Sequence, residues 1–117
     1  MATYTQTRLG AGPDLLTTSY VSIFQVDLGN TTIVKQIMVC NTNLSSTAST
    51  FSLCLTASGD GAANEPADVI FKAVSLDPGE TKLINLSLVM GPSENLWGKA
   101  SVAGEITITI SGIVEGP

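Results

Sequence analysis

The sequence predicts an all-β protein: a single antiparallel β-sandwich of jelly-roll or Greek-key type with about seven strands. In residues 105–111, isoleucine alternates strictly with small polar or charged residues, and this period of two gives a strand with one buried and one exposed face. Turn-forming residues also recur about every ten positions, with no helical period between them. A small closed barrel is the alternative architecture.

The N-terminal segment, residues 1–19, shows no steady period and is interrupted by glycine and proline at residues 10–14. Gly and Pro weaken strands and helices alike. We therefore predict an irregular N-terminal arm over residues 1–19 and a sandwich domain over residues 20–117.

The first three strands are predicted at residues 20–27, 32–41 and 49–57. The second contains a nearly continuous apolar run at residues 37–40, which is typical of a strand that is buried on both faces. The polar tract at residues 42–47 predicts a hairpin loop between the second and third strands.

A long Gly-rich loop over residues 58–67 precedes the fourth predicted strand, residues 68–76. The turn at residues 77–80 has proline in its second position and glycine in its third, where a positive φ angle is required. These signals predict that the fourth strand ends at this turn and that a fifth strand follows it.

The fifth strand, residues 81–89, is predicted to point Ile84, Leu86 and Leu88 to one face and its polar residues to the other. A Gly-Pro-Ser break ends it, and a sixth strand is predicted at residues 95–102. The isoleucine-rich strand described above is then the seventh.

The chain has 117 residues, which is close to the commonest domain size. Hydrophobic residues make up 44% and aromatic residues 5%, so the core must consist mainly of Ile, Val, Leu and Ala. Only 13% of residues are charged, about half the usual fraction. Two explanations remain open: a partner or further copies of the chain cover part of the surface, or the outer faces are simply rich in hydroxyl groups.

The net charge is −5, and the five basic residues are well separated. Phosphate binding requires clustered Lys and Arg, so direct nucleic-acid binding is not expected. No apolar stretch approaches the ~20 residues of a membrane-spanning helix, and the N-terminus lacks the pattern of a secretory signal. We therefore expect synthesis in a cytoplasm and no membrane association.

The chain contains no histidine, so the usual general base near neutral pH is absent. Asp60 and Glu65 lie in the Gly-rich loop, but the spacing of an EF-hand calcium loop is missing. We expect no enzymatic activity, no cofactor and no bound metal.

Cys40 and Cys54 are the two cysteines of the chain. If the strands that carry them form a hairpin, the thiols could come within bridging range, although a disulfide requires the two Cβ atoms to lie about 4 Å apart. Synthesis in a cytoplasm favours two reduced thiols, and the disulfide remains the alternative.

Four segments, residues 31–42, 59–61, 74–81 and 103–112, together resemble small all-β virion proteins of tailed bacteriophages. Proteins of that group occur as head decoration or cement proteins and as neck, tail or fibre modules. The resemblance implies a structural protein, commonly a homotrimer, without catalytic residues. It also implies a location in the virion after synthesis in the host cytoplasm.

The leading hypothesis is a capsid decoration protein whose partners are further copies of itself and the major capsid protein or another virion protein. The first alternative is a neck, tail or fibre component that acts in assembly or host attachment. A carbohydrate-binding module is a weaker alternative. The candidate interface residues are Tyr4, Arg8 and Leu9 in the predicted arm, Asp60, Asn64 and Glu65 in the Gly-rich loop, and Trp97.

Overall fold

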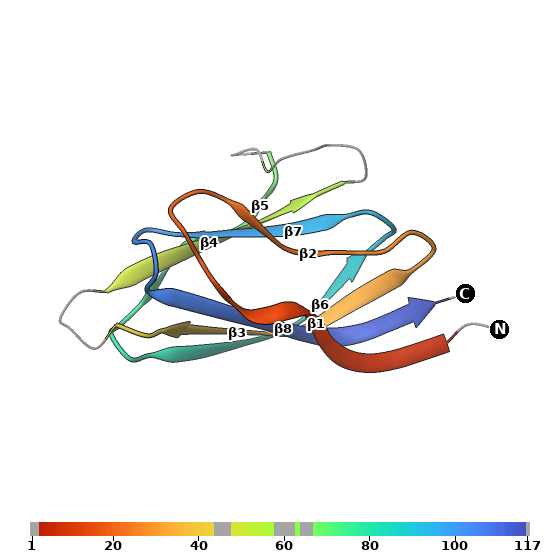
Figure 1. Cartoon of the computed structure of the whole chain (residues 1–117), viewed down its shortest axis with the longest axis horizontal. Helices are drawn as coiled ribbons and strands as arrows, with labels where there is room; N and C mark the ends of the chain where they lie inside the picture. The colour runs from red at the N-terminus through yellow and green to blue at the C-terminus, as the bar shows by residue number, and fades with distance from the viewer. Residues whose placement is uncertain (1–2, 44–47, 58–62, 64–66, 117) are drawn as a thin grey trace.

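The computed structural model describes residues 3–43, 48–57, 63 and 67–116, and these ranges contain eight strands (Figure 1). The strands are β1 (Thr3–Leu15), β2 (Val21–Gln25), β3 (Thr31–Asn41), β4 (Ser49–Thr56), β5 (Val69–Leu76), β6 (Thr81–Met90), β7 (Asn95–Ala100) and β8 (Ile106–Gly116). The all-β prediction is confirmed, with one strand more than the sequence indicated.

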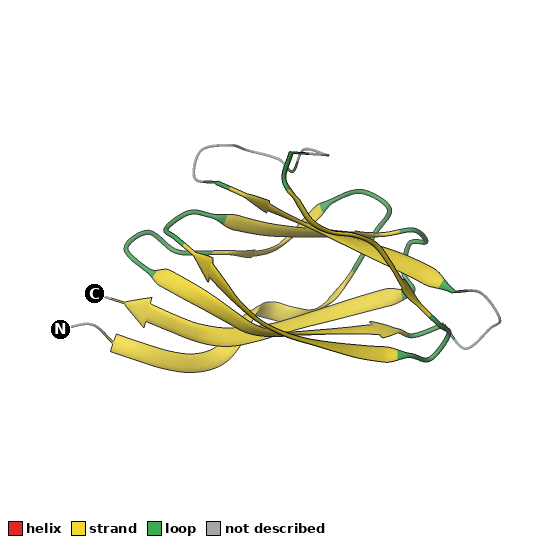
Figure 2. Ribbon diagram, turned by 180° about the vertical axis from the view of Figure 1, so that it is seen from behind, coloured by secondary structure: helices red, strands yellow, loops and turns green. Residues whose placement is uncertain are grey.

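The strands form two four-stranded sheets. We call β1-β8-β3-β6 the first sheet and β2-β7-β4-β5 the second sheet, and neighbouring strands in both are antiparallel. The two sheets lie face to face as two layers (Figure 2). The strand order is that of a jelly roll, in which every pair of consecutive strands except β4 and β5 is divided between the two sheets. The predicted sandwich is therefore confirmed.

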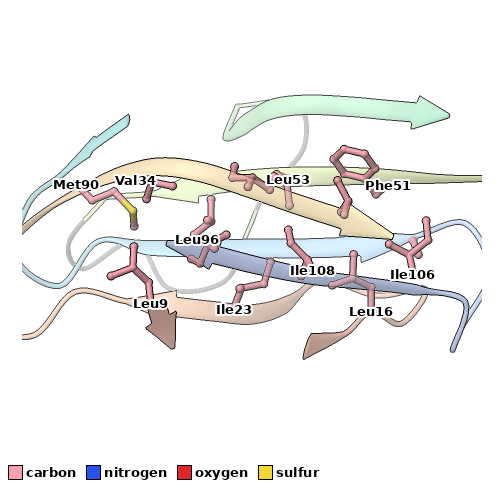
Figure 3. Close-up of a cluster of buried hydrophobic side chains, with 14 of the residues drawn as sticks. Leu9, Leu16, Ile23, Val34, Phe51, Leu53, Met90, Leu96, Ile106 and Ile108 are labelled. Carbon is pink, nitrogen blue, oxygen red and sulfur yellow. The ribbon is translucent and has the colours of Figure 1, made fainter. Parts of the chain in front are cut away.

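Aliphatic side chains from both sheets fill the space between the layers (Figure 3). The core residues are Leu9, Leu16, Ile23, Val26, Val34, Ile37, Val39, Phe51, Leu53, Leu76, Met90, Leu96, Ala100, Ile106, Ile108 and Ile110. The alternating isoleucines of β8 all point inward, while the residues between them are only partly covered. Among the described residues, Phe51 is the aromatic member of this buried cluster, and Phe24 and Phe71 pack against it while partly buried. The expectation of a core built mainly from aliphatic residues is confirmed.

The prediction of an irregular arm over residues 1–19 is wrong for residues 3–15, which form the edge strand β1. This strand pairs with β8 from Thr3 to Leu9 and again from Asp14, with an irregularity between the two stretches. Gly10 adopts a φ of 70° there, a conformation that glycine tolerates best. The glycines and the proline therefore interrupt the strand without ending it.

The predicted hairpin between the second and third strands is also wrong, because β3 belongs to the first sheet and β4 to the second. Asn41, the last residue of β3, and Ser49, the first residue of β4, therefore lie in different layers. Cys40 on β3 and Cys54 on β4 are not joined by a disulfide. The two thiols belong to different sheets.

The turn at residues 77–80 forms as the sequence predicts. Gly79 has a φ of 76°, and the amide of Glu80 donates to the carbonyl of Asp77 at 3.0 Å. This turn carries the chain from β5 in the second sheet to β6 in the first.

Candidate interaction surface

The outer face of the first sheet exposes a set of large hydrophobic side chains. Antiparallel partners directly opposite one another point to the same face, so the pairing of the four strands identifies every outward residue. Five of the seven exposed large hydrophobics among the described residues lie there: Tyr4, Leu15, Met38, Leu83 and Val89, with 68%, 56%, 41%, 54% and 61% of their surface exposed. The other two, Leu28 and Val102, lie in turns.

These side chains are arranged in rows that cross the sheet. Ile113, Ile33 and Val89 are direct neighbours on β8, β3 and β6. In a second apolar pair, Met38 on β3 lies opposite Leu83 on β6. The exposure of Met38 corrects the prediction that β3 is buried on both faces, because no described part of the chain forms a layer over the outer side of this sheet.

A polar row separates the two apolar groups. Gln36 lies opposite Asn85, and its side-chain amide donates to the Asn85 oxygen at 3.4 Å. The Lys35 ammonium donates to the Ser87 hydroxyl at 2.9 Å. The lysine therefore has a partner within its own sheet.

Charged side chains are sparse on this face. Among the described residues they are Arg8, Lys35 and Glu115. Depletion of charge together with exposed apolar side chains is typical of the centre of a protein–protein interface. The outer face of the first sheet is therefore the candidate interaction surface.

The structure places Tyr4 and Arg8 on this surface, but it places Leu9 elsewhere. Tyr4 lies on β1 opposite Glu115, and a hydrogen bond to the Glu115 carboxylate and its negative charge raise the pKa of the Tyr4 hydroxyl above its usual value. Arg8 lies opposite Ser111 and is exposed. Leu9 is 2% exposed and belongs to the core, because inward and outward residues alternate along β1.

Trp97 lies on the second sheet, so the structure does not bring it together with Tyr4 and Arg8. It follows the buried Leu96 on β7 and is half-buried on the outer side of that sheet. Its indole N–H donates to the Thr56 hydroxyl at 3.0 Å. Nearby on the same strand, the Lys99 ammonium lies 4.8 Å from the centre of the Tyr20 ring. These contacts hold the aromatic side chains in place.

The remaining candidates, Asp60, Asn64 and Glu65, lie outside the described residues. The loop at residues 91–95 is held against the sandwich by backbone hydrogen bonds. The amide of Ser93 donates to the carbonyl of Val26 at 2.9 Å, and the Glu94 carboxylate accepts from the amide of Gly91.

A polar cluster that the sequence did not indicate closes one end of the sandwich. Asn41 is fully buried; its amide donates to the carbonyl of Leu76 at 3.1 Å and its oxygen accepts from the amide of Asn43 at 3.0 Å. The Glu105 carboxylate accepts from the Asn43 side chain at 2.7 Å and from the Ser49 hydroxyl. The cluster ties the connection between β3 and β4 to the start of β8, so its role is structural.

The described part of the chain contains no group of three or more His, Cys, Asp or Glu residues that could hold a metal ion. Within the same ranges, no helix is long and apolar enough to span a membrane.

No family model matches the chain, and no curated protein matches its sequence. Solved structures are similar in fold. The T13 viral particle of infectious bursal disease virus matches over 99% of this chain with a TM-score of 0.54 and 12% identity. The VP2 subviral particle of the same virus matches over 97% with a TM-score of 0.54 and 14% identity.

The Gx strain of that virus gives a TM-score of 0.52 at 14% identity, over 99% of this chain. The chain spans about a third of the length of these three proteins, which it covers to 31%, 32% and 30%. At this level of identity the similarity establishes a shared fold.

Proposed function

We propose that this chain is a non-enzymatic structural protein of a virion and that, within this class, it is a head decoration or cement protein of a tailed bacteriophage. The observation that carries the proposal is the outer face of the first sheet, which exposes five large hydrophobic side chains and, among the described residues, three charged ones. The jelly-roll similarity to virus particle proteins and the sequence resemblance to phage virion proteins support the same class.

In this role the protein acts by binding. A decoration protein that binds only the assembled shell lowers the free energy of that state alone and thereby stabilises it. Contacts at several copies raise the effective affinity, because after the first contact the others form at high local concentration. Homotrimers placed on the major capsid protein would use this effect.

In this proposal, the outer face of the first sheet contacts the shell. Met38 lies near the middle of the outer face, on an inner strand of the first sheet, and is 41% exposed. A Met38→Lys substitution would place a solvated ammonium group at the centre of the contact at little cost to the fold, because the side chain already reaches solvent. Leu28→Lys is the matched control, since Leu28 is 84% exposed in the turn between β2 and β3.

The test combines localisation and binding. Immunogold electron microscopy of intact particles should label the head, and purified protein should bind emptied heads that lack it, with Met38→Lys reducing the affinity by about tenfold or more and Leu28→Lys leaving it unchanged. Label confined to the neck, tail or fibres would replace decoration by the alternative role in assembly or host attachment. Particles without label would refute the virion role.

The candidate interface residues of the predicted N-terminal arm, Tyr4, Arg8 and Leu9, lie on strand β1. Residues 3–15 pair with β8 and contribute Leu9 to the core, so deletion of this segment would damage the sandwich. The contact that β1 offers a partner is instead its outward side, where Tyr4 and Arg8 are exposed.

A further inference from the structure

The four edge strands of the sandwich differ in how well they are protected against pairing with another strand. β1 is interrupted between Leu9 and Asp14. β2 has only five residues and a register shift, and β5 has two register shifts and a positive φ of 49° at Ala73. Interruptions, short length and bulges are the usual means of preventing edge-to-edge association.

β6 has the least protection of the four. It is ten residues long and contains neither glycine nor proline. A single register shift separates its two stretches of pairing with β3, and exposed and partly buried residues alternate along the strand without interruption. Its one charged residue, Lys82, lies near its start and donates to the carbonyl of Ser75 at 3.4 Å.

The side chains of β6 are also arranged symmetrically about Leu86. Moving outward from that residue, polar Asn85 matches polar Ser87, and apolar Ile84 matches apolar Leu88. The next pair, Leu83 and Val89, is apolar and exposed at 54% and 61%. A strand with this pattern is complementary to itself when it runs antiparallel to a second copy.

We propose that two copies of this chain associate by pairing their β6 strands antiparallel, with Leu86 opposite Leu86. The two first sheets then form one continuous sheet across a twofold axis. Such a contact is isologous and closes at two copies. The inference does not depend on the proposed virion role.

This register joins matching rows on the outer face. Val89 of one copy faces Leu83 of the second copy, so the row of Ile33 and Val89 continues into the apolar pair of Leu83 and Met38. Asn85 faces Ser87 of the second copy, which extends the polar row that contains Gln36.

On the inner side, Ile84 faces Leu88 of the second copy, so half-buried apolar side chains at the margin of the core cover one another. Lys82 faces Met90, and the two lysines lie at opposite ends of the contact. Like charges therefore do not oppose each other. A shift of the register by one residue would place polar Asn85 and Ser87 against apolar partners.

Cysteine cross-linking tests the register. In a Cys40→Ser background, with Cys54 fully buried, a Leu86→Cys variant should form a disulfide-linked dimer under mild oxidation, trapped by alkylation before denaturation. Ser87→Cys is the matched control, because two residues at position 87 lie diagonally, about 8 Å apart, beyond the range of a disulfide. Equal cross-linking of the two variants, or none with Leu86→Cys, would overturn the proposed pairing.

The second measurement needs no cysteine. Light scattering coupled to size exclusion should show wild-type association through a twofold contact, as dimers or as hexamers if trimers also form. Leu83→Lys/Val89→Lys places lysines opposite one another twice and should raise the dissociation constant by about tenfold or more. Leu28→Lys, on a turn far from β6 in sequence, should not change it. An association state that is the same for wild type and the double variant would refute the inference, as would a wild-type monomer at millimolar concentration.

Discussion

The close approach of β8 to β3 at Gly112 gives a sharp prediction for Gly112→Ala. A Cβ atom at this position would lie 2.0 Å from the carbonyl oxygen of Ile33. Because real Cβ contacts are essentially never shorter than 3.0 Å, the β3 backbone must move by at least about 1 Å. Gly112 pairs with Val34 in the middle of the first sheet, so no flexible side chain is available to absorb the shift.

Overpacking usually costs 1–3 kcal/mol, and a contact with backbone in a central ladder falls at the upper end. We expect Gly112→Ala to lower the free energy of unfolding by about 3 kcal/mol, which corresponds to about 12 °C in Tm for a domain of this size. The change in the free energy of unfolding is measured by urea denaturation, with the fluorescence of Trp97 as the signal. Gly91→Ala, where the nearest atom is the Glu94 carboxylate oxygen at 3.4 Å, should change stability by less than about 0.5 kcal/mol. A loss below about 1 kcal/mol for Gly112→Ala would refute the β3–β8 register.

Three further predictions concern the core, the polar cluster and the exposed tyrosine. Ile108→Ala should cost about 3–4 kcal/mol, because the side chain is fully buried between the sheets, whereas Ile113→Ala on the outer face should cost less than about 1 kcal/mol; urea unfolding of both variants checks this. Asn41→Ala should cost about 2 kcal/mol in the same assay, because it removes two hydrogen bonds of a fully buried side chain. Tyr4 should ionise above the usual value of about 10, so the stabilisation from its hydrogen bond is present below that pH and is lost as the pH rises through its raised pKa. Absorbance titration, with Tyr4→Phe as the reference, should show that Glu115→Gln lowers the Tyr4 pKa.

The alternation of apolar and polar residues was sufficient to predict the strands that have one buried and one exposed face. The alternation of Ile106, Ile108 and Ile110 is visible in the sequence and determines which side of β8 enters the core. The turn at residues 77–80 was equally predictable, because its proline and glycine meet the φ requirements of that turn. In both cases, the information is contained within a few consecutive residues.

β1 could not be predicted in this way because its stability does not come from an apolar face of its own. Toward the core it contributes Leu9, and in its residues before Leu9, threonine alternates with Tyr4, Gln6 and Arg8. What holds the strand is pairing with β8, a strand about a hundred residues later in the sequence. Because backbone hydrogen bonds do not depend on the pattern of side chains, pairing between strands so far apart cannot be predicted from a short stretch of sequence.

The candidate interaction surface depends on the same long-range pairing. Met38 was expected to be buried because its neighbours in sequence are apolar, but the register with Leu83 places both on the uncovered side of the first sheet. The symmetric pattern about Leu86, in contrast, is visible in consecutive residues of the sequence. It can act in strand pairing only because β6 is an edge strand of the first sheet. The residue pattern of a strand thus determines which second strand it can pair with, while the topology determines which strands have an open edge for that pairing.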